Sequence, residues 1–233
     1  MALLKHKPRP LPLLISLVAF CTCVVFGTWQ IQRLIWKENL IERIETANAQ
    51  APLQALPPAE ELEQYHYYFV NLTGEYLHEH ELHLAARYHN SVLGYSILTP
   101  MALADGRIVM INRGWVPSDK KELETRPDSQ PDGTREITAM IRLNHERNPF
   151  TPPNQPERNV WFGRDVDEMA AYTELDLEPL TLDRIGEQME GFLPVPATGE
   201  VNLRNDHLSY VITWYLIAAG IAAIFITYHR KES

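Results

Sequence analysis

Cysteine is scarce in this chain of 233 residues, and the positions of the cysteines exclude several kinds of site. The only two, Cys21 and Cys23, lie in one apolar run near the N-terminus. The rest of the sequence therefore has no disulfide, zinc–thiolate centre or cysteine nucleophile. It also lacks glycine-rich phosphate loops, the GxSxG elbow and the HExxH zinc motif. No nucleophile–base–acid set is present either, so we expect a protein that is not an enzyme.

Positive charge is in short supply in the middle of the chain. Residues 30–207 contain 16 lysines and arginines against 29 aspartates and glutamates, a net charge of −13. Such an acidic segment would repel other polyanions, which argues against nucleic acid and anionic lipid as partners.

Two segments contain no charged residue at all. Residues 11–29 form an uncharged run of 19 residues, and residues 208–228 form one of 21. A helix that spans the hydrocarbon core of a bilayer needs about 20 apolar residues. We therefore predict transmembrane helices at 11–29 and 207–228, with two buried core helices as the alternative.

The first run has the basic N-terminal flank of a signal peptide but lacks a cleavage site. The sequence continues FGTWQIQR, and the small-x-small pattern at residues 47–49 comes about 20 residues too late. We therefore expect an uncleaved anchor. Only ten residues precede the run, too few for a mitochondrial transit peptide, which favours a bacterial protein of the inner membrane. Short basic tails at 1–10 and 229–233 predict that both termini are cytoplasmic and the central domain periplasmic.

The central region is predicted to begin with a helix and continue as β-structure. Residues 30–50 have the apolar spacing of an amphipathic helix, and the proline-containing APLQALPP follows. Residues 51–206 are expected to form one domain, in which short alternating runs predict strands and Asp105-Gly106 predicts a hairpin. We predict a mainly antiparallel β domain, a small barrel or sandwich, with short helices at 118–124 and 165–173.

Two clusters resemble metal sites, but each has a plainer interpretation. His78, His80, His83 and His89 lie in LHEHELHLAARYHN, where the alternation of histidine with glutamate favours a solvated strand face. Cys21 and Cys23 would suit Cu(I), but side chains two residues apart on a helix point in different directions.

Small residues recur along both apolar runs at four-residue intervals. Ala19, Cys23 and Gly27 form such a stripe in the first run, and Ala218/Ala222 or Ala219/Ala223 do so in the second. Small faces let membrane helices approach closely, so we expect the two helices to pack through these stripes.

The stretch RNDHLSY leads directly into the second run. Asn205 is the predicted N-cap, Asp206 suits the first turn, and His207 also falls in that turn. The positive end of the helix dipole disfavours an imidazolium there, and neutral imidazole is the metal-binding form.

A haem bound between the helices would find an axial nitrogen on His207. Tyr210 and Trp214 follow on the same face, and Arg204 would lie near a propionate. A structural histidine at the membrane interface is the alternative, and the residues alone favour it.

Five blocks of sequence, in order from residue 27 to 215, resemble the Surfeit locus protein 1 family. They are GxWQxxRxxWK (27–37), GY with TP (94–100), NRGWVP (112–117), NxPERNxW with RD (154–165) and RNxHLxYxxTWY (204–215). The chain is short before the GY…TP block, where the family carries extra sequence. The blocks together are specific, whereas each alone would be weak.

The resemblance implies an assembly factor for cytochrome c oxidase that supplies haem a to the oxidase core subunit, with haem a synthase as a further expected partner. It also implies that His207 is the haem-ligand histidine. Trp29 and Arg33 would then line the haem or anchor the helix at the interface. A protein that holds an oxidase subunit without binding haem is the alternative function, and a haem-modifying enzyme is a third.

Four motif residues fall in the predicted β domain: Arg113, Arg158, Trp161 and Arg164. We expect the arginines to form buried networks that hold loops, with a partner-docking face as the alternative.

Overall fold

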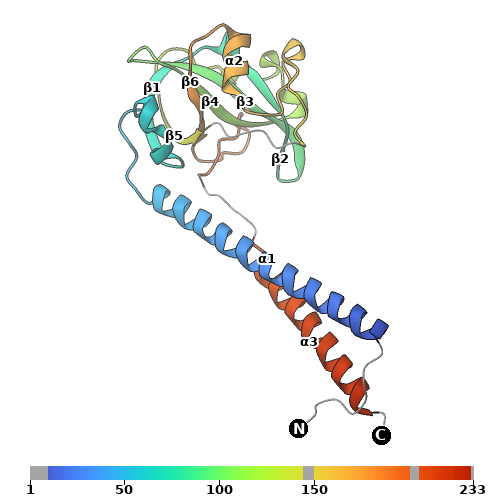
Figure 1. Cartoon of the computed structure of the whole chain (residues 1–233). Coiled ribbons are helices and arrows are strands. Elements are labelled where there is room, and N and C mark those ends of the chain that lie inside the picture. Colours follow the sequence, from blue (N-terminus) through green and yellow to red (C-terminus); the bar gives the residue numbers. More distant parts are fainter. Residues whose placement is uncertain (1–9, 144–149, 200–204, 232–233) are drawn as a thin grey trace. The chain divides into compact units, whose positions relative to one another are not determined.

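The protein is described by a computed structural model of residues 10–143, 150–199 and 205–231. The chain divides into two compact units, Met1–Arg43 with Asn202–Ser233, and Ile44–Val201. The first contains most of two long helices and the second contains the β-structure (Figure 1).

The two long helices are α1 (Pro10–Asn48) and α3 (His207–Lys231). Helix α1 continues without a break from the apolar run into the amphipathic segment. Both helices are long and apolar enough to cross a membrane, and most of their large apolar side chains are exposed. Exposed apolar surface on this scale is rare in soluble proteins and suits lipid. The chain thus has two candidate membrane spans, and the limits at 11–29 and 207–228 stay predictions.

The helices α1 and α3 are antiparallel and meet along small residues, as predicted. Cys23 and Gly27 are buried on α1, and Ala218 is buried on α3. A Cβ atom at Gly27 would lie 3.0 Å from the ring of Tyr215, so this glycine makes room for an aromatic ring. Cys23 is buried and Cys21 is exposed, so the two thiols lie in different environments. This arrangement fits a packing role for Cys23 rather than a metal site made by both cysteines.

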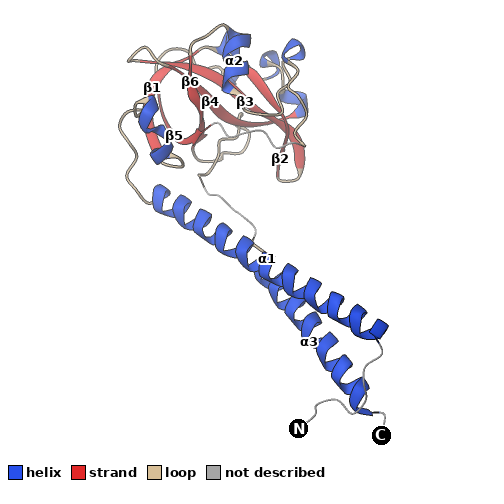
Figure 2. Cartoon of the chain, in the orientation of Figure 1, coloured by secondary structure: helices blue, strands red, loops and turns tan. Residues whose placement is uncertain are grey.

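The second unit contains a small, closed, five-stranded β-barrel (Figure 2). The order around the ring is β1–β5–β6–β4–β3, and β3 pairs back with β1. All of these pairs are antiparallel except β4–β6, which is parallel, and β2 extends the sheet beside β3. The strands are β1 (Phe69–Tyr76), β2 (Leu82–His89), β3 (Val92–Leu103), β4 (Ile108–Pro117), β5 (Arg135–Leu143) and β6 (Leu177–Ile185).

The predicted hairpin joins β3 to β4. Gly106 has φ +89°, a conformation that glycine adopts without strain, and its N–H donates to the carbonyl of Leu103 at 3.0 Å. The prediction of a mainly antiparallel barrel or sandwich is therefore confirmed in its barrel form.

Two apolar cores lie on the two sides of the sheet. The interior core contains inward residues of all five barrel strands, such as Val70, Ile111 and Leu182. The outer core packs β2, β3 and β4 against Trp161 and Met169, the latter from α2 (Val166–Thr173). Helix α2 confirms the predicted helix at 165–173, because the Asp165 carboxylate caps it by accepting from the N–H of Glu168 at 3.1 Å.

The single helix predicted at 118–124 is wrong. That region forms short 3₁₀ turns, Ser118–Lys120, Leu123–Thr125 and Pro127–Ser129. The Arg126 side chain donates to the carbonyls of Lys120 and Lys121 at 2.9 and 3.0 Å, so those carbonyls are satisfied without α-helical bonds. Other 3₁₀ turns are Ala59–Tyr65, His78–His80 and Pro156–Arg158.

Candidate functional site

His207 is the first residue of α3 and is half-buried against α1. Its Nδ1 lies 2.6 Å from the amide oxygen of Gln30. An amide oxygen can only accept, so Nδ1 carries the proton and donates it to Gln30. In the neutral imidazole, the other ring nitrogen, Nε2, then keeps its lone pair, which is the form in which histidine binds metals.

The start of α3 differs by one residue from the prediction. The N–H of Tyr210 donates to the carbonyl of Asp206 at 3.4 Å, which places Asp206 rather than Asn205 at the N-cap. The Ser209 hydroxyl also donates to that carbonyl, at 2.7 Å. His207 remains in the first turn of α3.

Aromatic contacts join the two helices about two turns of α3 beyond His207. The rings of Phe26 and Trp214 are stacked, with centroids 5.0 Å apart and planes at 30°. Beside this pair, the hydroxyls of Thr28 and Tyr215 lie 3.1 Å apart. These contacts fix the rotation of α3 on α1, so they also hold His207 facing Gln30.

The other predicted site residues lie around this contact rather than in it. Trp29 is 49% exposed and Tyr210 is 54% exposed, so both rings are open to the surroundings of the helix pair. The Arg33 guanidinium stacks 4.4 Å above the ring of Trp36 on the same helix. Arg204 lies outside the described residues.

Sequence reasoning missed Gln30, although it belongs to the first motif block. It is adjacent to Trp29, which was the residue predicted for the site. Helical spacing contained the signal, because Cys23, Gly27 and Gln30 fall on one face at intervals of four and three.

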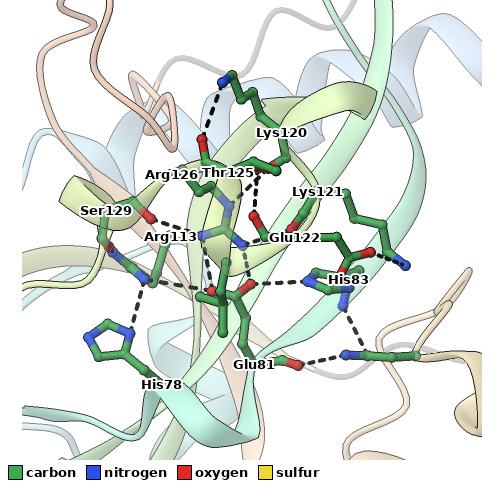
Figure 3. Close-up of polar contacts among 12 residues, drawn as sticks. His78, Glu81, His83, Arg113, Lys120, Lys121, Glu122, Thr125, Arg126 and Ser129 are labelled. Atoms are coloured by element: carbon green, nitrogen blue, oxygen red, sulfur yellow. Dashed lines mark hydrogen bonds and ion pairs between the residues drawn. The ribbon is translucent and has the colours of Figure 1, made fainter.

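A second polar centre lies buried in the β unit, around Glu81 (Figure 3). Arg126 donates to both carboxylate oxygens of Glu81, to Oε2 at 3.2 Å and to Oε1 at close range. His83 Nε2 lies 3.0 Å from Oε1, and Arg113 Nη1 lies 3.9 Å from Oε2. All four residues are at most 5% exposed, so this is a buried ion network.

The network holds the segment of 3₁₀ turns against the barrel. Arg126 also donates to the Ser129 hydroxyl at 3.0 Å, and Arg113 donates to the Ser129 carbonyl. Burial raises the pKa of Glu81, but hydrogen bonds from His83 and Arg126 outweigh it and leave that pKa below its ordinary value. Glu81 is thus an anion at neutral pH, and the buried arginine network predicted for Arg113 is confirmed.

The solvated histidine face predicted for LHEHELHL is wrong. His78 and His80 lie in a 3₁₀ turn, and His83 is buried on β2 beside Glu81. The alternation with glutamate arises because Glu81 is the counter-ion of the buried network. Within the described residues, no group of three or more His, Cys, Asp and Glu side chains is placed to hold a metal.

The remaining motif residues of the β domain have separate roles. Trp161 is fully buried in the outer core, and Arg164 pairs with Asp183 at 2.8 Å. Arg158 is exposed and donates to Gln155 at 3.3 Å, so it is not part of a buried network.

Comparison with known proteins covers most of the chain. Residues 17–219 match the model of the SURF1 family. The SURF1-like protein of Drosophila melanogaster is 35% identical over 244 residues, which cover 97% of this chain and 79% of that protein. Surfeit locus protein 1 of Homo sapiens is 33% identical over 229 residues, covering 91% and 74% of the two chains. The Xenopus tropicalis protein of that name is 33% identical over 211 residues, covering 83% and 68%.

Proposed function

Because this chain belongs to the SURF1 family, whose members are non-enzymatic cytochrome c oxidase assembly factors, we propose that it binds haem a and delivers it to the oxidase core subunit. Binding takes place at the end of the helix pair where α3 begins. His207 would hold the haem iron through Nε2.

The observation that carries the proposal is the hydrogen bond from His207 Nδ1 to Gln30 at 2.6 Å. In the neutral ring this bond places the proton on Nδ1, leaves Nε2 with its lone pair and orients the imidazole. Metal-binding histidines usually donate their second N–H to such a partner, which also raises the basicity of the ligand nitrogen.

The surrounding residues suit a flat, apolar ring with acidic edges. Tyr210 and Trp214 follow His207 on α3 and Trp29 precedes Gln30 on α1, so aromatic surface lies on both helices. About half of the Trp29 and Tyr210 surface is exposed and free to receive a ligand. Arg33 and Arg204 supply positive charge for propionates. Haem iron binds histidine nitrogen, so His207 would hold the iron while Arg33 and Arg204 would hold the propionates.

Delivery requires that the site release its ligand. His207 stands at a helix end with half-buried surroundings rather than inside a closed cavity, which favours moderate affinity. We further propose a bacterial inner-membrane location with both termini in the cytoplasm, the β domain in the periplasm and haem a synthase as a second partner. A periplasm-active reporter fused after Ser233 should then stay silent, and activity there would refute this orientation.

The test is a spectrum of the full-length protein, purified after co-expression with haem a synthesis. The wild type should carry a Soret band, and His207→Ala should lose it. Gln30→Leu should lower haem occupancy, by roughly 10–100-fold in affinity, because the ligand ring loses its orienting acceptor. His80→Ala, which removes a histidine of the β domain, is the matched control and should keep the band.

Two results would overturn the proposal. One is a wild-type protein that carries no haem under these conditions. The other is a His207→Ala variant with an unchanged Soret band. A haem-free wild type that still co-purifies with the core subunit would favour the alternative, a protein that holds an oxidase subunit during assembly.

A further inference from the structure

Arginines extend the inward-facing rows of the barrel on three strands. Strand residues alternate between faces, so the position two residues beyond an interior residue faces the same way. Arg113 follows Ile111 on β4, Arg184 follows Leu182 on β6, and Arg135 precedes Ile137 on β5. The barrel interior is therefore apolar along most of its length and basic at one end.

These strands bring the arginines to the same end of the barrel. Strand β5 is antiparallel to β6, so the start of β5 and the end of β6 coincide, and β4 is parallel to β6. Strand β1 is antiparallel to β5 and ends there with Tyr76, which also continues an inward row.

A pocket of about 230 Å³ lies among these four side chains, Tyr76, Arg113, Arg135 and Arg184. Pro131, Glu136 and Ile137 complete its lining. The lining thus contains three arginines and one glutamate, which together carry two net positive charges. This excess stands out in a central region whose own net charge is −13.

Two of the lining groups are buried without a hydrogen-bond partner in the described part of the chain. Tyr76 is 7% exposed and its hydroxyl is unpaired, and Arg113 is 2% exposed and its Nε is unpaired. The other two nitrogens of Arg113 are occupied, Nη1 near His78 at 3.4 Å and Nη2 on the Ser129 carbonyl (Figure 3). Native proteins rarely leave buried donors unsatisfied, so an acceptor belongs beside them.

The charge of Arg113 is also incompletely balanced. Its nearest carboxylate, Glu81, lies 3.9 Å away and is already bound at closer range by Arg126. Arg135 and Arg184 have no side-chain hydrogen bond or ion pair to any described residue. Burial lowers the pKa of Arg113. Burial also raises the pKa of Tyr76, and this effect outweighs the opposing charges of Arg113 and Arg184. Tyr76 therefore keeps its proton at neutral pH and can donate it in a hydrogen bond.

We propose that this pocket binds a small dianionic oxyanion of the phosphate type. Its two charges balance the lining, and its oxygens accept from the Tyr76 hydroxyl and from the arginines, whose planar forks suit phosphate. The volume excludes a nucleotide, and the acidic domain would repel an extended anionic surface. The ligand is therefore a free ion or the phosphate of a small organic ester. This inference does not rest on haem binding.

Calorimetric titration of the full-length protein in uncharged detergent tests the proposal. Inorganic phosphate is the probe, and chloride at matched ionic strength is the blank. Arg184→Gln should raise the dissociation constant at least tenfold, and Tyr76→Phe, which keeps the packing, should raise it several-fold. Arg158→Gln removes an exposed arginine of the same domain and should change it less than twofold.

Glycerol 3-phosphate distinguishes the two sources of phosphate. Tighter binding than inorganic phosphate identifies an ester, and weaker binding identifies the free ion. Thermal unfolding without phosphate checks that each variant is folded. If Arg184→Gln is unfolded, the dissociation constant of Tyr76→Phe decides the test. The proposal is overturned if phosphate gives no more heat than chloride, or if Arg158→Gln and Tyr76→Phe weaken binding equally.

Discussion

Replacing Glu81 by glutamine should destabilise the β domain severely while leaving its shape almost unchanged. The substitution keeps the volume of the side chain but removes the only carboxylate, among the described residues, that pairs with both Arg113 and Arg126. Their side chains are 3% and 2% exposed, so water cannot take over the role of counter-ion. Breaking one partner of a buried ion pair costs about 3–5 kcal/mol.

That loss should be visible as a lower unfolding temperature. For a domain of this size, each kcal/mol shifts Tm by about 2–4 °C, so Glu81→Gln should lower it by roughly 6–20 °C. Differential scanning calorimetry of the full-length protein in detergent measures the shift of the β-domain transition.

The exposed pair of Asp105 and Arg107 is a matched control. Its atoms lie 2.7 Å apart, but its side chains are 50% and 26% exposed. Exposed pairs contribute about 0–1 kcal/mol, so Asp105→Asn should barely change Tm. If Glu81→Gln and Asp105→Asn have equal effects, burial does not set the strength of this network and the reasoning is wrong.

A double variant separates the ion pair from the other bonds of Arg126. Arg126→Met removes the cation together with its donors to the loop carbonyls of Lys120 and Lys121. Combined with Glu81→Gln, it should cost less than the sum of the two single changes, by at least about 1 kcal/mol. Additive effects would mean that the carboxylate and the guanidinium act independently.

Three further predictions follow from the backbone and from titration. Gly114→Ala should cost about 3 kcal/mol or more in chemical denaturation, because φ is +131° and the new Cβ would lie 2.1 Å from a carbonyl oxygen, whereas Gly106→Ala, with open space at φ +89°, should cost only about 1–2 kcal/mol. Gly27→Leu should lower the thermal stability of the helix pair in detergent, because an aromatic ring lies 3.0 Å from the Cβ position, and an unchanged midpoint would refute this packing. Acidification should destabilise the β domain in two steps. The pKa of His78 is lowered by burial, so stability falls as the pH drops below about 6.5, and the lowered pKa of Glu81 adds a loss below about 4.3. In a plot of Tm against pH, the step near pH 6.5 should be present in the wild type and absent in His78→Asn.

Features that depend on neighbouring residues were predictable from the sequence. The two uncharged runs, the Asp105-Gly106 hairpin and the capped helix after Asp165 are all local, and the structure contains each of them. Closure of the barrel was not predictable, because it depends on β3 pairing with both β2 and β1 along its length. No local pattern determines which strand closes a ring.

The same limit applied to the polar centres. Alternation of histidine and glutamate in LHEHELHL indicates a strand face in water as readily as a buried ion pair, because both need polar residues at alternate positions. The burial of Glu81 is decided by Arg126, which lies 45 residues further along the chain. The turn that presents Arg126 is held by the bond itself, so neither partner identifies the other in the sequence.

His207 shows how far a local argument extends and where a distant contact must complete it. The dipole of α3 disfavours a charged imidazole, but it does not decide which ring nitrogen keeps the proton. Gln30 decides that, from a position 177 residues earlier in the chain. An amide at that position accepts from Nδ1 without bringing a charge into an apolar helix pair. Leucine at this position would remove the acceptor, whereas glutamate would keep one. Gln30→Leu should therefore lose more haem occupancy than Gln30→Glu, because only the first leaves the His207 ring without an orienting acceptor. The Soret absorbance of the two purified variants at one pH measures the difference, and equal losses would show that accepting from Nδ1 is not what Gln30 contributes.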